Sequence, residues 1–137
     1  MNIIVDTSVW SLAFRKRDLT KDETKIVEDL SELIKDLRVV MIGPIRQEIL
    51  SGISNVNKFE ELKERLLVFI DLPIKTPEYE LAAQYYNKCR KHGVQGSHID
   101  FLICSVASNG SYPIFTLDND FRNYKKYLPI ELYTWNK

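Results

Sequence analysis

Three short apolar runs, separated by long stretches with helical spacing, constrain the fold of this chain most strongly. The runs are residues 3–5, 39–42 and 113–117. Each is too short for a helix core and lacks the alternation that is typical of a strand with one solvated face. Strands that are apolar on both faces are typical of parallel sheets covered by helices on two sides. We therefore predict an α/β fold, a three-layer α/β/α sandwich with a mainly parallel central sheet.

Amphipathic patterns between the runs predict the helices. A capping-box sequence at residues 20–23 precedes apolar residues that repeat at helical spacing up to Leu37. Further helices are expected near residues 43–52, 59–69, 76–93, 97–110 and 119–125. Residues 131–135 alternate weakly between apolar and polar, and we predict an edge strand there.

Length and composition favour a single domain over residues 1–137, because the chain has no repeat, linker or low-complexity tract. A chain of this size can bury a core without disulfides or zinc. Its longest apolar run, residues 66–70, is far shorter than the roughly 20 residues of a membrane helix. The first residues also lack a basic signal-peptide segment. We expect a cytoplasmic protein without a membrane partner.

Charge, cysteine and histidine usage restrict the possible functions. The 19 basic residues equal the 19 acidic ones, so any binding to nucleic acid must be local. Cys89 and Cys104 lack Cys-x-x-Cys spacing and are expected in or near the core. His92 and His98 are six residues apart, which does not fit the helical spacing of a zinc hydrolase. Any metal should therefore have oxygen ligands.

Acidic residues follow the predicted strands at the points where ligands bind in open α/β sheets. Asp6 directly follows the first apolar run and Asp118 the third, and Glu48 lies in the short helix after the second. Asp100 lies in the first turn of the helix that begins near Ser97, and Asp120 follows Asp118 by two residues. These five carboxylates are expected to converge at one edge of the sheet.

Each carboxylate also has a purely structural interpretation. Asp100 can complete a capping box with Ser97, Asp118 can cap the helix that follows it, and Glu48 can be a solvated helix residue. Asp6 is harder to explain in this way, because a carboxylate that ends a buried strand must be paired, protonated or bound to a ligand.

The combination favours a metal centre. Carboxylates about 5 Å apart repel by roughly 3 kcal/mol per pair at an effective dielectric of 20, so a cluster of them requires a cation. Oxygen ligands alone favour Mg²⁺ or Mn²⁺. Such ions activate water and stabilise charge during displacement at phosphorus, so we expect phosphate-ester chemistry.

The segments that carry these carboxylates resemble the four motifs of PIN-domain ribonucleases. They are the strand-ending Asp6-Thr7-Ser8, residues 44–49 around Glu48, residues 98–107 with Asp100, and residues 115–121 with Asp118. Their order and spacing match the family over nearly the whole chain. In particular, the chain resembles VapC-type toxins of bacterial and archaeal toxin–antitoxin (VapBC) pairs, which are single PIN domains of about this length.

The resemblance implies a PIN-like fold and a Mg²⁺- or Mn²⁺-dependent endoribonuclease. The implied catalytic residues are Asp6, Glu48, Asp100 and Asp118. The implied metal ligands are these four and Asp120. Hydrogen bonds from Thr7, Ser8 and Thr116 would orient ligands or metal-bound waters. The implied partners are a structured RNA substrate such as tRNA or rRNA, a small VapB-like antitoxin, and a second copy of the chain in a homodimer.

Basic residues flank the acidic motifs and offer local contacts for RNA phosphates. The candidate RNA-binding residues are Arg15, Lys16, Arg17, Lys91 and Arg122. Arg15 to Arg17 are expected in a loop after the first motif. For each basic cluster, the alternative is an ordinary solvated surface.

Other functions remain as alternatives. A phosphoacceptor signalling domain would need an adjacent acidic pair after the first strand and a lysine after a late strand, and the sequence has neither. A catalytically idle PIN scaffold, binding RNA or protein, would not need all four acidic positions. A PIN nuclease that processes RNA without a toxin role fits the same residues, and sequence alone discriminates poorly between it and a toxin.

Overall fold

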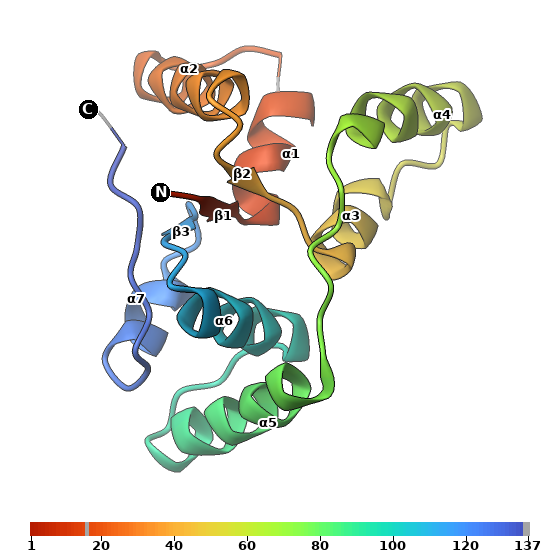
Figure 1. Ribbon diagram of the computed structural model, residues 1–137. Coiled ribbons are helices and arrows are strands. Elements are labelled where there is room, and N and C mark those ends of the chain that lie inside the picture. The colour runs from red at the N-terminus through yellow and green to blue at the C-terminus, as the bar shows by residue number, and fades with distance from the viewer. Residues whose placement is uncertain (16, 136–137) are drawn as a thin grey trace.

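A three-stranded parallel sheet, in the order β2–β1–β3, lies at the centre of the computed structural model, which describes residues 1–15 and 17–135 (Figure 1). The elements, in chain order, are β1 (Ile3–Val5), α1 (Thr7–Arg15), α2 (Lys21–Lys35), β2 (Val39–Val40), α3 (Gly43–Leu50), α4 (Val56–Arg65), the 3-10 helix η1 (Leu66–Val68), α5 (Thr76–Lys91), α6 (His98–Gly110), β3 (Ile114–Phe115) and α7 (Asp120–Lys125).

The central strand is β1, and its three residues are completely buried. Its Ile4 is opposite Val40 on one side and Ile114 on the other, and both pairings are parallel. The predicted α/β sandwich with a parallel sheet is thus confirmed. Because all three strands run the same way, the ends of β1 and β3 bring Asp6 and residues 116–118 to one edge.

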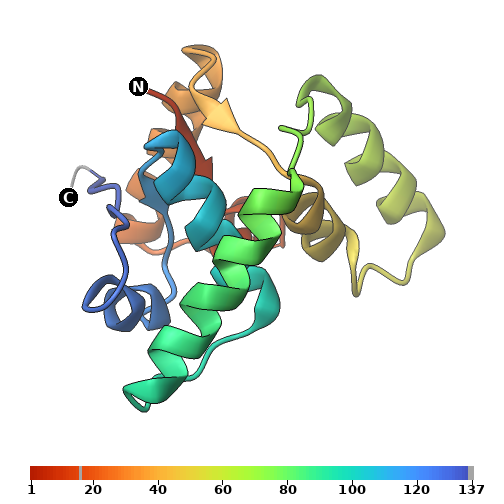
Figure 2. The ribbon, with the colours of Figure 1, turned by 60° about the horizontal axis from the view of Figure 1, so that its bottom comes forward.

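Helices lie on both sides of these strands. In Figure 1, α2 lies above the sheet with α1 beside β2, α6 lies below the sheet, and α5 packs along the outside of α6. Helices α3 and α4 stand to one side, as the turned view also shows (Figure 2). The indole of Trp10 in α1 is fully buried and donates a 3.0 Å hydrogen bond to the carbonyl oxygen of Val5.

Two of the predicted strands are shorter than expected. In the second, pairing ends at Val40, because Met41 makes only an isolated bridge to Asp71 and the chain then enters α3 at Gly43 and Pro44. In the third, the ladder ends at Phe115, and the next backbone N–H groups bond to side chains of the site instead, that of Leu117 to Ser8 Oγ and that of Asp118 to Thr116 Oγ1.

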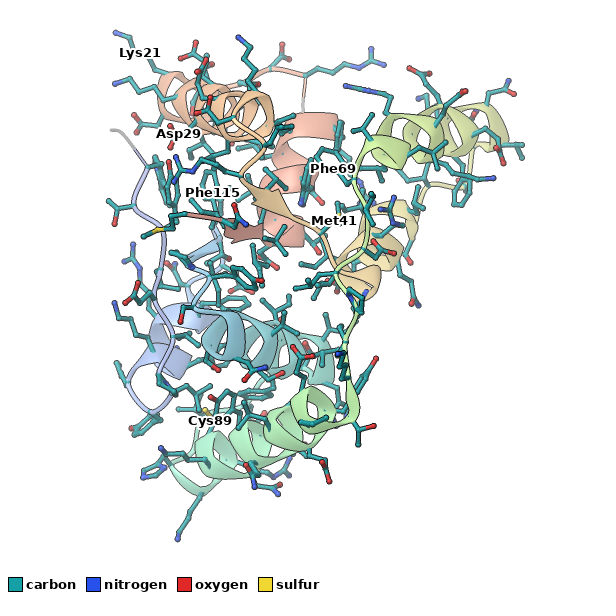
Figure 3. All side chains as sticks on the ribbon, in the orientation of Figure 1. Lys21, Asp29, Met41, Phe69, Cys89 and Phe115 are labelled. Atoms are coloured by element: carbon teal, nitrogen blue, oxygen red, sulfur yellow. The ribbon has the colours of Figure 1, made fainter. Side chains whose placement is uncertain are left out.

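The predicted edge strand at residues 131–135 is wrong. Only Leu132 makes an isolated parallel bridge, to Ile114. Since β3 has two residues, it offers few further ladder partners. The segment is held by two backbone hydrogen bonds, from Ile114 N–H to the Glu131 carbonyl oxygen and from Tyr133 N–H to the Ile114 carbonyl oxygen. Aromatic packing adds to them, with the rings of Tyr133 and Trp135 centred 4.9 Å and 5.8 Å from that of Phe115, which is labelled in Figure 3.

The helices of the structure differ from the predicted helices in two places. The capping box at Thr20 and Glu23 opens α2 as expected, but residues 7–15 form a helix that the sequence analysis did not predict. The helix expected over residues 59–69 ends at Arg65, and the chain continues as η1 before Phe69 becomes extended.

Both cysteines are buried and free, as expected. Burial raises the pKa of each thiol. Within the described part of the chain, no helix combines the length and the apolar character needed to cross a membrane.

Candidate metal centre

Asp6 occupies the first position after β1, and only 6% of its surface is exposed. One carboxylate oxygen, Oδ2, accepts hydrogen bonds from Ser8 Oγ at 2.7 Å and from Thr116 Oγ1 at 2.9 Å. Ser8 also accepts a bond from the backbone N–H of Leu117. These contacts fix the orientation of the Asp6 carboxylate and join the ends of β1 and β3.

Glu48 reaches the same end of the sheet from α3. Its Oε1 accepts a 2.8 Å hydrogen bond from the hydroxyl of Thr7, the residue that follows Asp6. Thr7 therefore holds the Glu48 side chain in place. This contact favours the functional interpretation of Glu48 over that of a solvated helix residue.

Asp100 lies in the first turn of α6, where Ser97 Oγ accepts a hydrogen bond from its backbone N–H. The Asp100 carboxylate itself accepts a 2.6 Å bond from the hydroxyl of Tyr124 in α7. Burial raises the pKa of the Asp100 carboxyl above its ordinary value, and the nearby charges of Asp6 and Asp118 add to this effect. Hydrogen bonds from Tyr124 and Ser97 act in the opposite direction.

Asp118 and Asp120 complete an acidic cluster with Asp100. One carboxylate oxygen from each of the three residues lies within 4.8 Å of the others. Asp118 also keeps a local role, because its Oδ1 accepts a hydrogen bond from the backbone N–H of Asp120. The donor set consists of carboxylate oxygens alone, so it fits Mg²⁺ or Mn²⁺ better than Zn²⁺ or Cu²⁺.

The five predicted carboxylates therefore fall into groups. Asp100, Asp118 and Asp120 form the cluster that can hold a cation directly. Asp6 is close enough to Asp100 to raise the pKa of that carboxyl. Glu48 is tied to the site through Thr7.

Tyr124 belongs to this site and was missed by the sequence analysis. It is completely buried in α7, and burial, followed by its hydrogen bond to Asp100, raises the pKa of the phenol well above its ordinary value. The signal that could have indicated it is the three-residue spacing of Phe121 and Tyr124, which places both on one buried face of α7. A tyrosine in a core needs a polar partner, but the spacing does not say which.

The predicted RNA-binding residues lie in different surroundings. Arg15 is the last residue of α1 and not part of a loop, and its guanidinium donates bonds to the carbonyl oxygens of Ile49 at 2.8 Å and Ser51 at 2.9 Å. It is in a helix because Trp10 and Leu12 anchor α1 in the core. Lys16 lies outside the described residues. Lys91 is exposed at the end of α5.

Arg122 shares a cavity with one residue of the acidic cluster. It lines a cavity of about 450 Å³ together with Asp118, Lys125 and Trp135. Its position beside Asp118 therefore suits a contact with a phosphate near the cluster.

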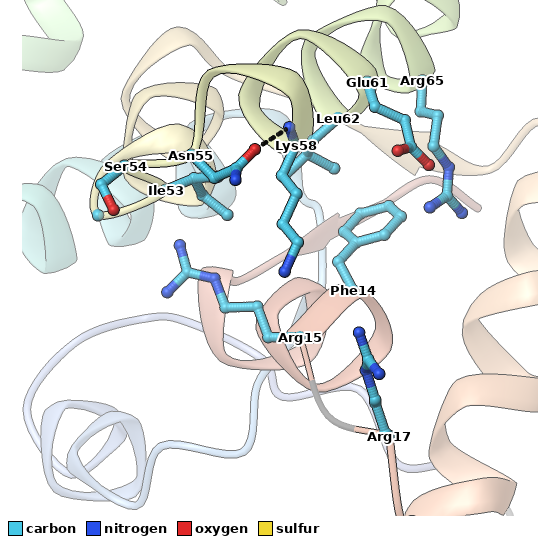
Figure 4. A pocket seen from close by; sticks show the side chains of 11 residues that line it. Phe14, Arg15, Arg17, Ile53, Ser54, Asn55, Lys58, Glu61, Leu62 and Arg65 are labelled. Atoms are coloured by element: carbon cyan, nitrogen blue, oxygen red, sulfur yellow. Dashed lines mark hydrogen bonds between the residues drawn. The ribbon is translucent and has the colours of Figure 1, made fainter.

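A larger groove, of about 540 Å³, lies between the end of α1 and α4 (Figure 4). Phe14 lines the groove, and the guanidinium of Arg65 lies 4.8 Å from the centre of the Phe14 ring. Its charged lining residues are Arg15, Arg17, Lys58, Glu61 and Arg65. The groove thus combines an aromatic surface with a net positive charge.

Comparisons with known proteins agree with the fold of this chain. The chain is similar to FitAcB from Neisseria gonorrhoeae, with 23% identity, coverage of 96% of both chains and a TM-score of 0.76. It is also similar to FitAB bound to an IR36 DNA fragment, with 22% identity, 96% and 93% coverage and a TM-score of 0.73. VapBC2 from Rickettsia felis, bound to a DNA fragment from its promoter, shares 15% identity, with 99% and 100% coverage and a TM-score of 0.77.

At these identities, the structural neighbours show the fold. No curated protein matches the chain. A family model described as the PIN domain matches residues 3–127. Because this match spans most of the sequence, the chain belongs to the PIN domain family.

Proposed function

We propose that this chain is a metal-dependent endoribonuclease and the toxin of a VapBC-type pair. The observation that carries the proposal is the convergence of carboxylate oxygens from Asp100, Asp118 and Asp120 within 4.8 Å, beside the buried Asp6. A bound Mg²⁺ or Mn²⁺ would supply a nucleophilic water near neutral pH and stabilise charge on the phosphodiester.

Residues of the chain would bind the cation, orient water and bind the RNA. Asp100, Asp118 and Asp120 would hold the cation. Asp6, fixed by Ser8 and Thr116, and Glu48, fixed by Thr7, present further negative charge that can orient water at the same edge. Arg122 and Lys125, which line the cavity beside Asp118, would bind neighbouring RNA phosphates.

The first test is cleavage of tRNA and rRNA by the purified protein. Reactions with Mg²⁺, with Mn²⁺, with EDTA and with the Asp100→Asn variant are compared. Discrete fragments that need both metal and Asp100 support the nuclease and identify its substrate. Intact RNA after incubation with a folded protein, free of any copurified inhibitor, contradicts the nuclease and favours a PIN scaffold that binds without cutting.

The toxin role needs a separate test, since a processing nuclease would use the same residues. FitAcB, FitAB and VapBC2 bear the names of two-component assemblies, which supports an antitoxin partner for this chain. The basic groove around Phe14 suits a segment of such a partner that carries apolar and acidic side chains. The test is expression of the chain in the cytoplasm of a host cell. Growth arrest that is absent with Asp100→Asn supports a toxin, whereas unaffected growth favours the processing role.

The proposal includes a homodimer, which light scattering of the purified chain tests directly. A mass of twice 16.0 kDa supports it, and a mass of 16.0 kDa contradicts it.

A further inference from the structure

The contact between Tyr124 and Asp100 joins two helices at the acidic cluster. The phenol hydroxyl of Tyr124, in α7, donates a 2.6 Å hydrogen bond to Oδ2 of Asp100, in α6, across 24 residues of sequence. One of the two Asp100 oxygens is therefore engaged by a neutral donor. The carboxylate cannot rotate freely without breaking this bond.

The Tyr124 ring is itself held in place by aromatic neighbours. It is completely buried, and its centroid lies 4.9 Å from that of Phe101 and 5.2 Å from that of Phe121. Phe121 directly follows Asp120, so the helix turn that holds the ring also carries a member of the cluster.

Gly96 leaves the space that the hydroxyl needs. A Cβ atom at position 96 would lie 2.4 Å from the Tyr124 oxygen and 2.9 Å from the Phe101 ring. Real Cβ atoms do not approach this closely, so a side chain at position 96 requires a shift of the phenol or of the groups packed around it. The phenol thus reaches Asp100 through a gap that only glycine leaves open.

We propose that Tyr124 is a positioning residue, which holds the Asp100 carboxylate in the orientation that lets Asp100, Asp118 and Asp120 share one divalent cation. This inference rests on the proposed function, because it assigns a metal to the cluster. Hydrogen bonds from outer residues to metal ligands typically account for about 10- to 100-fold in metal affinity or activity. The alternative is that Asp100 merely satisfies a buried phenol and the bond serves only stability.

The test measures Mn²⁺ binding by calorimetry, without RNA. Tyr124→Phe removes the hydroxyl and keeps the ring, and we expect its Mn²⁺ affinity to fall by about 10-fold. The matched control is Tyr133→Phe, because the Tyr133 hydroxyl donates a similar 2.9 Å bond to a carboxylate, that of Asp29, outside the cluster. The control should bind Mn²⁺ as the wild type does.

A second variant keeps the hydroxyl but moves it. Gly96→Ala should lower Mn²⁺ affinity, as Tyr124→Phe does, since its Cβ would lie 2.4 Å from the Tyr124 oxygen and crowd the phenol. Loss of thermal stability in Tyr124→Phe with unchanged Mn²⁺ affinity would overturn the proposal, and so would a wild-type protein that binds no Mn²⁺. A wild type that binds Mn²⁺ but cuts no RNA contradicts the nuclease, while the affinities of the variants still decide the role of Tyr124.

Discussion

The hydroxyl of Thr7 donates a 2.8 Å hydrogen bond to Oε1 of Glu48, although the two residues are 41 positions apart. This bond connects the first residue of α1 to the C-terminal half of α3 and fixes the Glu48 carboxylate beside the end of β1. Glu48 therefore depends on a neighbour for its place in the site. The dependence can be tested by removing the hydroxyl alone.

Thr7→Val should lower the rate of RNA cleavage by about 10-fold, because a free Glu48 side chain loses its orientation. Thr7→Ser keeps a hydroxyl and should retain most of the activity. Single-turnover cleavage assays of the two variants measure the difference. Equal rates for Thr7→Val and the wild type would show that the Thr7–Glu48 bond has no part in catalysis.

Asp100→Asn should lower cleavage by about 100-fold or more while the protein stays folded. The amide preserves the shape of the side chain and removes one negative charge from the cluster. Asp6→Asn should behave in the same way. Circular dichroism and cleavage assays of both variants provide the comparison, and unfolding of either variant in the absence of metal would mean that its carboxylate is structural.

The raised pKa of Asp100 predicts a pH dependence of stability. The folded protein binds this proton more tightly than the unfolded chain does, so the stabilising contribution is fully present below the unfolded pKa of about 3.9. It is lost as the pH rises through the higher pKa of the folded state. In EDTA, the difference in urea midpoint between wild type and Asp100→Asn should therefore grow in favour of the variant from pH 4 to pH 7. A difference that stays constant over this range would contradict the shift.

Loss of the positive charge should affect stability at Arg15 and RNA binding at Arg122. Arg15→Gln removes bonds to two carbonyl oxygens and should destabilise the fold by about 1–3 kcal/mol. Arg122→Gln changes an exposed residue and should leave the free energy of unfolding nearly unchanged while raising the KM for RNA. Urea unfolding and cleavage kinetics of the pair separate the two roles. The reverse pattern would show that Arg15, not Arg122, contacts the substrate.

Leu37 has a left-handed backbone, with φ of 57°, and 88% of its surface is exposed. A left-handed backbone destabilises a residue with a side chain by about 1–2 kcal/mol, and glycine removes this strain. The larger conformational entropy of glycine in the unfolded chain opposes the gain by about 0.5–1 kcal/mol. Leu37→Gly should thus stabilise the protein by about 0.5 kcal/mol. The matched control is Ile70→Gly, because Ile70 is 89% exposed and does not have a positive φ. Thermal unfolding should show a gain only for Leu37→Gly.

The parts of the fold that sequence predicted share a physical basis. Asp6 and Asp118 could be placed together because each follows an apolar run, and parallel strands bring such positions to one edge. Helix α2 could be predicted because its capping box and apolar spacing are local signals.

The parts that sequence did not predict depend on tertiary contacts. Helix α1 contains serine, valine and tryptophan, which have modest helix propensity, and it is held by burial of Trp10 and the bond from its indole to Val5. The chain around Tyr133 resembles a strand in sequence, but the two residues of β3 pair with it only at the bridge between Ile114 and Leu132. The partner of Tyr124 could not be found from spacing alone, because spacing gives a face of a helix and not the atom it meets.

Thr116 bonds to Asp6 across 110 residues of sequence, and β3 pairs directly with the first strand of the chain. During synthesis on a ribosome, Asp6 emerges early but its neighbours Thr116 and Asp118 emerge late. A nascent chain that stops before β3 has an open edge on β1 and no acidic cluster, because long-range pairing must wait for the later segment. The order of translation thus delays assembly of the site until nearly the whole domain can fold.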